Sequence, residues 1–200
     1  MKKASGRANP VKWQEVARGR FINEVAGLNY DEFMEEALTQ ARKAYAADQF
    51  PVGCVIVQDG GVIASGCRAG TSGDLAFFSE IDHAEIRALK SLEAYEGEFK
   101  PERAVLFCTM EPCLMCFAAI ILSGIKTVVF AYEDVMGGGT NCDLNSLSPL
   151  YRESGVRVVP HVLREKSLDL FYDFFNKEAN LYWKGSLLEA YTLAQRQGAG

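Results

Sequence analysis

Two short segments carry side chains that together could bind a metal ion and move protons. Residues 82–85 read DHAE, and residues 111–116 read EPCLMC. An imidazole and two thiolates are typical zinc ligands, and catalytic zinc keeps one position open beside three protein ligands. We therefore predict that His83, Cys113 and Cys116 bind one zinc ion per chain, with a water or hydroxide as the fourth ligand.

The spacing of these residues suits the predicted chemistry. Cys113 and Cys116 are three apart at the start of an expected helix, so their sulfur atoms project to the same side. Pro112 suits the first helical position, and the positive helix end favours thiolates. A zinc-bound water has a pKa near about 7. Glu85 could move its protons to a substrate, so that an amine is replaced by a carbonyl and ammonia leaves.

Other interpretations of the same residues remain open. Asp82 and Glu85 also form a capping-box pattern. A Cys-x-x-Cys pair that opens a helix is also typical of thioredoxin-like redox sites. A non-catalytic, structural zinc-binding module would need a fourth protein ligand, for which Cys142 and His161 are the candidates. The joint occurrence favours catalysis, because the chain has only two histidines and His83 lies two residues before a glutamate.

The remaining cysteines and His161 are interpreted mainly as structural residues. Three of the cysteines lie in or beside expected strands, where a reduced thiol behaves as a small hydrophobic side chain. We expect these to be core residues: Cys54, Cys67 and Cys108. Cys142 lies in a polar loop and is not assigned, and His161 is expected to be structural.

Composition and charge limit the classes of function. The chain has 200 residues, 48% of them hydrophobic, which is enough for one substantial core. It has neither an apolar run of about 18 residues nor a signal-peptide pattern, so we expect a cytoplasmic protein without membrane contact. The formal charge of -5 argues against a protein whose main affinity for nucleic acid comes from neutralising phosphates. The first twenty residues are basic. We interpret them as a solvated terminus, and the alternative is an arm that binds phosphates.

Hydrophobic periodicity predicts helices alternating with strands. A final helix is followed by a weaker helical stretch up to Gln197. Expected helices cover 30–50, with a cap at Asn29, and 83–95, 113–122, 147–154 and 164–182; expected strands cover 51–57, 62–66, 104–109, 127–132 and 156–162. We predict an α/β fold, a three-layer α/β/α sandwich in which one mixed five-stranded sheet has helices on both faces. A helix separates the last two strands, which are therefore expected to be parallel.

The motifs resemble those of the cytidine and deoxycytidylate deaminase superfamily, over residues 31–177. The matching segments are 51–53 (PVG), 83–86 (HAEI), 109–116 (TMEPCLMC) and 173–175 (DFF). Within the superfamily the chain is most similar to the branch of tRNA adenosine deaminases and guanine deaminases. The resemblance implies a cytidine deaminase-like fold, zinc ligation by His83, Cys113 and Cys116, and acid/base catalysis by Glu85.

We expect a basic N-terminal extension (1–29), a zinc-dependent deaminase domain (30–183) and a C-terminal helical tail (184–200). A homodimer is expected from the resemblance alone. The substrate class is less determined, because residues 66–69 read GCRA where this branch typically has a base-contacting asparagine. The following loop carries Phe77 and Phe78, which could stack on a base or fill the core.

Together with the acidic charge balance, these departures favour a small aminated heterocycle as substrate: a nucleobase, a nucleoside or a related compound. A tRNA-specific adenosine deaminase that converts adenosine to inosine is the alternative. The basic residues near the N-terminus could supply a local contact to such an RNA.

Overall fold

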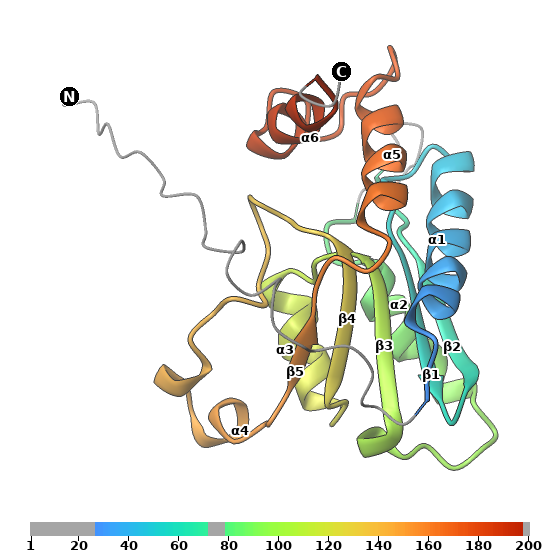
Figure 1. The fold of residues 1–200 in the computed structure, drawn as a ribbon, viewed down its shortest axis with the longest axis vertical. Helices are drawn as coiled ribbons and strands as arrows, with labels where there is room; N and C mark the ends of the chain where they lie inside the picture. Colours follow the sequence, from blue (N-terminus) through green and yellow to red (C-terminus); the bar gives the residue numbers. More distant parts are fainter. Residues whose placement is uncertain (1–26, 72–78, 198–200) are drawn as a thin grey trace.

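The computed structural model describes residues 27–71 and 79–197. Its strands and helices follow the alternation expected from the sequence (Figure 1). The strands are β1 (Gly53–Gln58), β2 (Gly61–Cys67), β3 (Ala104–Met110), β4 (Thr127–Tyr132) and β5 (Arg157–Val159). The helices are α1 (Tyr30–Ala46), α2 (Ala84–Ser91), α3 (Leu114–Leu122), α4 (Pro149–Arg152), α5 (Arg164–Phe175) and α6 (Leu187–Gln197), and short 3-10 turns occupy Leu92–Ala94, Pro101–Arg103 and Leu144–Ser146.

The five strands form one mixed sheet in the order β2-β1-β3-β4-β5. Strand β1 is antiparallel to both β2 and β3, whereas β3, β4 and β5 are parallel. The predicted mixed sheet and the predicted parallel pair of final strands are therefore confirmed. Because β2 and β3 both oppose β1, they run in the same direction, and the chain leaves both strands at the same edge of the sheet.

Helices cover both faces of the sheet, which confirms the three-layer sandwich (Figure 1). On one face, α1 packs Met34 and Leu38 against side chains such as Phe107. On the other face, α2 and α3 contribute buried residues that include Ala88 and Ile120. The cluster on this second face therefore holds α2 and α3, the helices that start at the site described below.

Several elements end earlier than hydrophobic periodicity predicts. The expected strand 156–162 stops at Val159, because Pro160 has no N–H for the ladder and His161 has a φ of 67°. Helix α1 stops at Ala46 rather than residue 50, and Asp48 adopts a φ of 55°. The expected N-cap of α1, Asn29, occupies that position but makes no capping hydrogen bond through its side chain.

The C-terminal segment packs onto the rest of the domain. Leu188 of α6 is buried in the core, and Oγ1 of Thr192 lies 3.0 Å from the hydroxyl of Tyr132 at the end of β4. The expected helix 164–182 is interrupted after Phe175, and α6 follows as a separate helix beside α5 (Figure 1). The division into residues 1–29, 30–183 and 184–200 stays a prediction.

Within the described ranges, no helix has the length and apolar character needed to cross a bilayer.

Candidate metal centre and pocket

Three potential metal ligands meet at the N-terminal ends of α2 and α3. Nδ1 of His83 lies 3.6 Å from Sγ of Cys113 and 3.4 Å from Sγ of Cys116. The ligand atoms of all three residues lie within 4.8 Å of one another. No other group of three or more histidine, cysteine or carboxylate side chains in 27–71 and 79–197 is arranged to share an ion. The structure thus brings together the three predicted ligands.

Both helices place these ligands in their first turn. His83 is the N-cap of α2 and Cys113 is the N-cap of α3, each with extended backbone angles, while Cys116 lies one turn into α3. Pro112 was expected at the first helical position. It instead precedes the N-cap Cys113 and lies outside the helix. The unpaired N–H groups of these helix ends favour anionic ligands.

The thiols and the imidazole already influence one another. Hydrogen bonds from Cys116 and His83 lower the pKa of Cys113 to about 4, against the opposing effect of burial. The same pairing raises the pKa of Cys116, because a second thiolate beside the first is unfavourable. Two sulfur atoms and one imidazole nitrogen at this separation suit a soft divalent cation such as zinc.

Glu85 lies in the first turn of α2 and is only 3% exposed. Burial raises its pKa, as expected for a carboxyl group removed from water. The capping-box interpretation is wrong, because the N-cap of α2 is His83 rather than Asp82 and makes no side-chain cap bond. Asp82 instead lies 3.8 Å from Nη1 of Arg87. Glu85 is thus a buried carboxyl group without a structural capping role.

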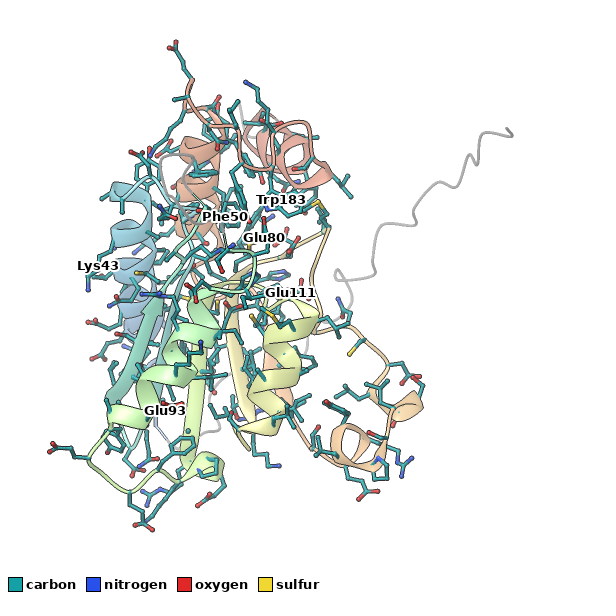
Figure 2. The ribbon with its side chains drawn as sticks, turned by 180° about the vertical axis from the view of Figure 1, so that it is seen from behind. Lys43, Phe50, Glu80, Glu93, Glu111 and Trp183 are labelled. Atoms are coloured by element: carbon teal, nitrogen blue, oxygen red, sulfur yellow. The ribbon has the colours of Figure 1, made fainter. Side chains whose placement is uncertain are left out.

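A cavity of about 330 Å³ opens beside these residues. Its wall combines aromatic and aliphatic side chains with carboxylates, an arrangement typical of sites for small molecules. Figure 2 shows Glu111 at the start of α3, with the wall residues Phe50, Glu80 and Trp183 between it and the C-terminal helices. The described lining residues are Phe50, Val52, Arg68, Glu80, His83, Ala84, Glu85, Met110, Glu111, Cys113, Asp134, Met136, Gly137, Tyr182, Trp183 and Leu188.

Glu111 holds the loop that forms one side of the cavity. Its Oε1 accepts a 2.5 Å hydrogen bond from the hydroxyl of Thr140, and its Oε2 accepts one from the backbone N–H of Asp134. The carboxylate is 4% exposed. Glu111 belongs to the cysteine motif, but the motif alone does not predict this role. The glycine-rich loop 137–139 was the sequence feature that could have indicated this role, because a loop of this kind needs hydrogen bonds from elsewhere to hold its conformation.

The other cysteines and His161 lie outside the metal cluster. Cys54 and Cys108 are fully buried partners across β1 and β3, which confirms their interpretation as core residues, whereas Cys67, also expected in the core, is only partly buried at the end of β2. Cys142 packs against the core from the loop, and His161 lies 3.5 Å from Glu133. Neither candidate fourth ligand joins the cluster. Phe77, Phe78 and the basic residues before Ala26 lie outside the described residues.

Comparisons of the sequence with known proteins identify a family and relatives. A family model described as the cytidine and deoxycytidylate deaminase zinc-binding region matches residues 29–132. A tRNA-specific adenosine deaminase of Streptococcus pyogenes is 33% identical over 145 residues, which cover 72% of this chain and 89% of the relative. The tRNA-specific adenosine deaminase of Bacillus subtilis is 33% identical over 151 residues, 75% of this chain and 91% of the relative.

Solved structures give the same result for the fold. A structure from work on A-to-I editing by tRNA:A34 deaminases has a TM-score of 0.54 and 31% identity, and the match covers 70% of this chain and 98% of that one. A variant of the protein NE0047 in complex with 8-azaguanine has a TM-score of 0.59 and 25% identity, covering 73% and 84% of the two chains.

The family model spans the β1–β2 hairpin, both ligand-bearing helix ends and strands β3 and β4, whereas the cavity residues from Asp134 onward lie beyond the match. The curated relatives extend the likeness to nearly three quarters of the chain. This chain therefore belongs to the cytidine and deoxycytidylate deaminase family of zinc-dependent enzymes, which hydrolyse C–N bonds.

Proposed function

We propose that this deaminase acts on a small aminated heterocycle, with zinc held by His83, Cys113 and Cys116 and with Glu85 as the proton carrier. The observation that carries the proposal is the meeting of these three ligands with a buried carboxyl group in the wall of one cavity. The amino group on the ring is replaced by a carbonyl oxygen. The reaction consumes one water molecule and releases one ammonia molecule.

Bound zinc would supply a water molecule with a pKa lowered to about 7, at the fourth ligand position. Glu85 would accept a proton from that water, transfer it to a ring nitrogen of the substrate, and then protonate the departing amine. Its raised pKa suits both directions of transfer, because an acid–base group works best when its pKa approaches the working pH.

The charge of the cavity wall supports a small heterocycle. Its described part carries four carboxylates, Glu80, Glu85, Glu111 and Asp134, and a single guanidinium, that of Arg68. The Arg68 guanidinium already donates to the backbone oxygens of Ala69 and Ser79. Carboxylates accept hydrogen bonds from the N–H and amino groups of a base, but they repel the phosphates of a nucleic acid. The similarity to a protein bound to 8-azaguanine is consistent with such a substrate.

The second candidate is adenosine in a tRNA. It is favoured by the names of the curated relatives, which are tRNA-specific adenosine deaminases with 33% identity to this chain. An extruded loop base could enter the same cavity while other surfaces bind the RNA backbone.

We also propose a homodimer, with an exposed apolar face of α3 and its neighbouring loops as the contact. Leu114 and Leu122 of α3 are 59% and 61% exposed. Large apolar side chains on one surface are typical of protein interfaces. Other exposed large apolar side chains are Val135 and Met136 after β4 and Leu147 and Leu150 before and in α4. Light scattering after size exclusion should give twice the chain mass, and Leu122→Glu should give one chain mass; a monomeric parent protein would contradict this proposal.

An ammonia-release screen tests the enzymatic proposal. The substrates are adenine, guanine, cytosine, their nucleosides, related aminated rings and an unmodified tRNA. Glu85→Ala should keep about one zinc per chain and lose at least about a hundredfold in turnover. Glu93→Ala, an exposed glutamate just beyond α2, is the matched control and should be fully active. Full activity of Glu85→Ala would reject the proton carrier, and turnover of tRNA alone would reject the small substrate.

A further inference from the structure

The segment that joins α5 to α6 supplies one wall of the cavity. Tyr182 and Trp183, which we call the roof, line the cavity together with Leu188 at the start of α6. They come from the last tenth of the chain, beyond the part matched by the family model. Figure 2 shows Trp183 beside Phe50 and Glu80. The roof is therefore a feature that the zinc motifs do not determine.

Arg68 fastens the roof to the end of β2. Its side chain is 2% exposed, and its Nη2 donates to the backbone oxygen of Ser79 at 2.8 Å and to the hydroxyl of Tyr182 at 3.4 Å. The Tyr182 hydroxyl donates in turn to Oε2 of Glu80 at 3.0 Å. A charge-assisted network of this kind, centred on a buried guanidinium, restricts the position of the Tyr182 hydroxyl.

Aromatic packing fixes the Tyr182 ring from the other side. Its centroid lies 5.3 Å from that of Phe50, which itself packs against Phe171 and Phe174 of α5. The backbone N–H of Tyr182 also donates to Oδ1 of Asn180. Tyr182 therefore has a fixed ring, a fixed hydroxyl and a fixed backbone.

Trp183 lines the cavity as Tyr182 does, but it differs in its exposure, because 41% of its surface remains accessible. Its indole contacts the edge of the Tyr182 ring, with centroids 5.6 Å apart and an interplanar angle of 74°. Its φ of 56° lies in the left-handed region, which residues other than glycine seldom adopt. A large apolar side chain is thus held at the cavity by a rigid neighbour and leaves much of its own surface uncovered.

We propose that Trp183 is a ring-binding residue of this deaminase, and that its indole stacks on the heterocycle while Tyr182 acts as a positioning residue. The inference rests on the proposed function, because it assumes that a free aminated ring enters the cavity. Stacking suits this role because every base has an aromatic face, and an indole provides a broad, rigid platform. The carboxylates of the wall then select among rings by their hydrogen-bond donors.

Kinetics with the best substrate from the ammonia screen give the first test. Trp183→Ala should raise KM about tenfold to hundredfold, with kcat changed by less than about threefold, because stacking contributes to binding of the ring before reaction. Trp183→Phe should restore most of the lost affinity. Leu181→Ala is the matched control, since Leu181 is 80% exposed in the same segment and is not among the cavity residues.

Tyr182→Phe tests the positioning role. It keeps the ring that packs on Phe50 but removes the hydroxyl that joins Arg68 and Glu80. KM should rise several-fold while kcat and zinc content stay unchanged, and in a Trp183→Ala background Tyr182→Phe should add little further loss. Independent, multiplicative effects of the two substitutions would reject the positioning role.

A binding measurement separates this inference from the proposed reaction. The chain has two tryptophans, so Trp13→Phe leaves Trp183 as the single indole. In a Trp13→Phe, Glu85→Ala protein, the bases and nucleosides of the screen should quench Trp183 fluorescence in a saturable titration.

Quenching without turnover in the active protein would reject the proposed reaction and retain the stacking role. Turnover of a base with neither quenching nor a change of KM in Trp183→Ala would overturn the stacking role and leave the proposed reaction intact. Neither quenching nor turnover by any small ring would overturn both.

Discussion

Nδ1 of His83 and Sγ of Cys113 lie 3.6 Å apart, although the two residues are separated by 30 positions in the chain. The contact follows from the direction of the strands. Because β2 and β3 run the same way, the chain leaves both at the same edge of the sheet, and α2 and α3 begin there. Ligands of α/β proteins typically bind at such an edge, where connections diverge.

Removal of one ligand should release the metal. Purified protein should contain about one zinc per chain, and Cys116→Ser or His83→Ala should lose most of it, because two remaining protein ligands do not form a stable zinc site. Elemental analysis after dialysis measures the content. The double variant Cys142→Ser, His161→Ala is the control and should keep its zinc, since neither residue joins the cluster. Loss of zinc from that control would instead favour a structural site with four protein ligands.

Gly66→Ala should displace the helix that carries Glu85. A Cβ atom at Gly66 would overlap the backbone oxygen of Ala84 and the backbone nitrogen of Ala88, and neither can move without α2. We expect a loss of about 1–3 kcal/mol in the free energy of unfolding, and a larger loss of activity. Urea denaturation and ammonia release measure the two effects.

Gly61→Ala is the matched control for that variant. Its Cβ would meet only the backbone oxygen of Gln58, at an ordinary 3.7 Å. Both stability and activity should stay near those of the parent protein. An equally stable and active Gly66→Ala would show that α2 does not depend on this close approach.

Local patterns predicted those parts of the fold whose cause is local. Strand β4 has the predicted bounds, Thr127–Tyr132, because a short apolar run rich in β-branched residues indicates a buried strand. The metal cluster was predictable because its residues occur in two short motifs. Helix boundaries were less predictable, since the apolar pattern of α5 continues past Phe175 whereas the helix ends there.

The roof could not be predicted in this way. Arg68 and Tyr182 are separated by 114 positions, and no periodicity links an arginine after one strand to a tyrosine between two helices. The left-handed φ of Trp183 was also not predictable, because glycine and asparagine are the residues that usually adopt this conformation. The contacts arise only when α5 and α6 pack on the sheet, so the tertiary structure was needed to find them.

The Glu111–Thr140 hydrogen bond should stabilise the loop beside the cavity. Thr140→Val has nearly the same shape but lacks the hydroxyl that donates to Oε1 of Glu111. We expect a loss of about 1–2 kcal/mol and faster amide exchange at Asp134 and Thr140, whose N–H groups also donate to this carboxylate. Thr39→Val on the exposed side of α1 is the control. Unchanged exchange in Thr140→Val would mean that the backbone bonds alone hold the loop.

Glu133 joins α5 and α6 to the end of β4, and its replacement should weaken the fold. The carboxylate is 5% exposed and accepts hydrogen bonds from Nε and Nη2 of Arg164 and from the hydroxyl of Tyr191. Glu133→Gln leaves the Arg164 guanidinium with only the exposed Glu165 as a charged partner, so we expect a loss of about 2–3 kcal/mol in the free energy of unfolding. Glu153→Gln, in an exposed pair with Arg152, should have almost no effect.

The same carboxylate should make stability depend on pH. Burial raises the pKa of Glu133, but the hydrogen bonds from Arg164 and Tyr191 outweigh burial and hold this pKa below its usual range. A lowered pKa contributes stability above the unfolded value of about 4.3, and this stability is lost as the pH falls through the folded value.

His161, 3.5 Å from Glu133, has a pKa lowered by burial, so its protonation reduces stability already below about pH 6.5. Urea unfolding between pH 8 and pH 3 separates the two groups. The parent protein should lose stability in both ranges, whereas Glu133→Gln should keep the loss near pH 6 and show a smaller one below about pH 4. Parallel curves for the two proteins across the acidic range would show that Glu133 titrates as it does in the unfolded chain.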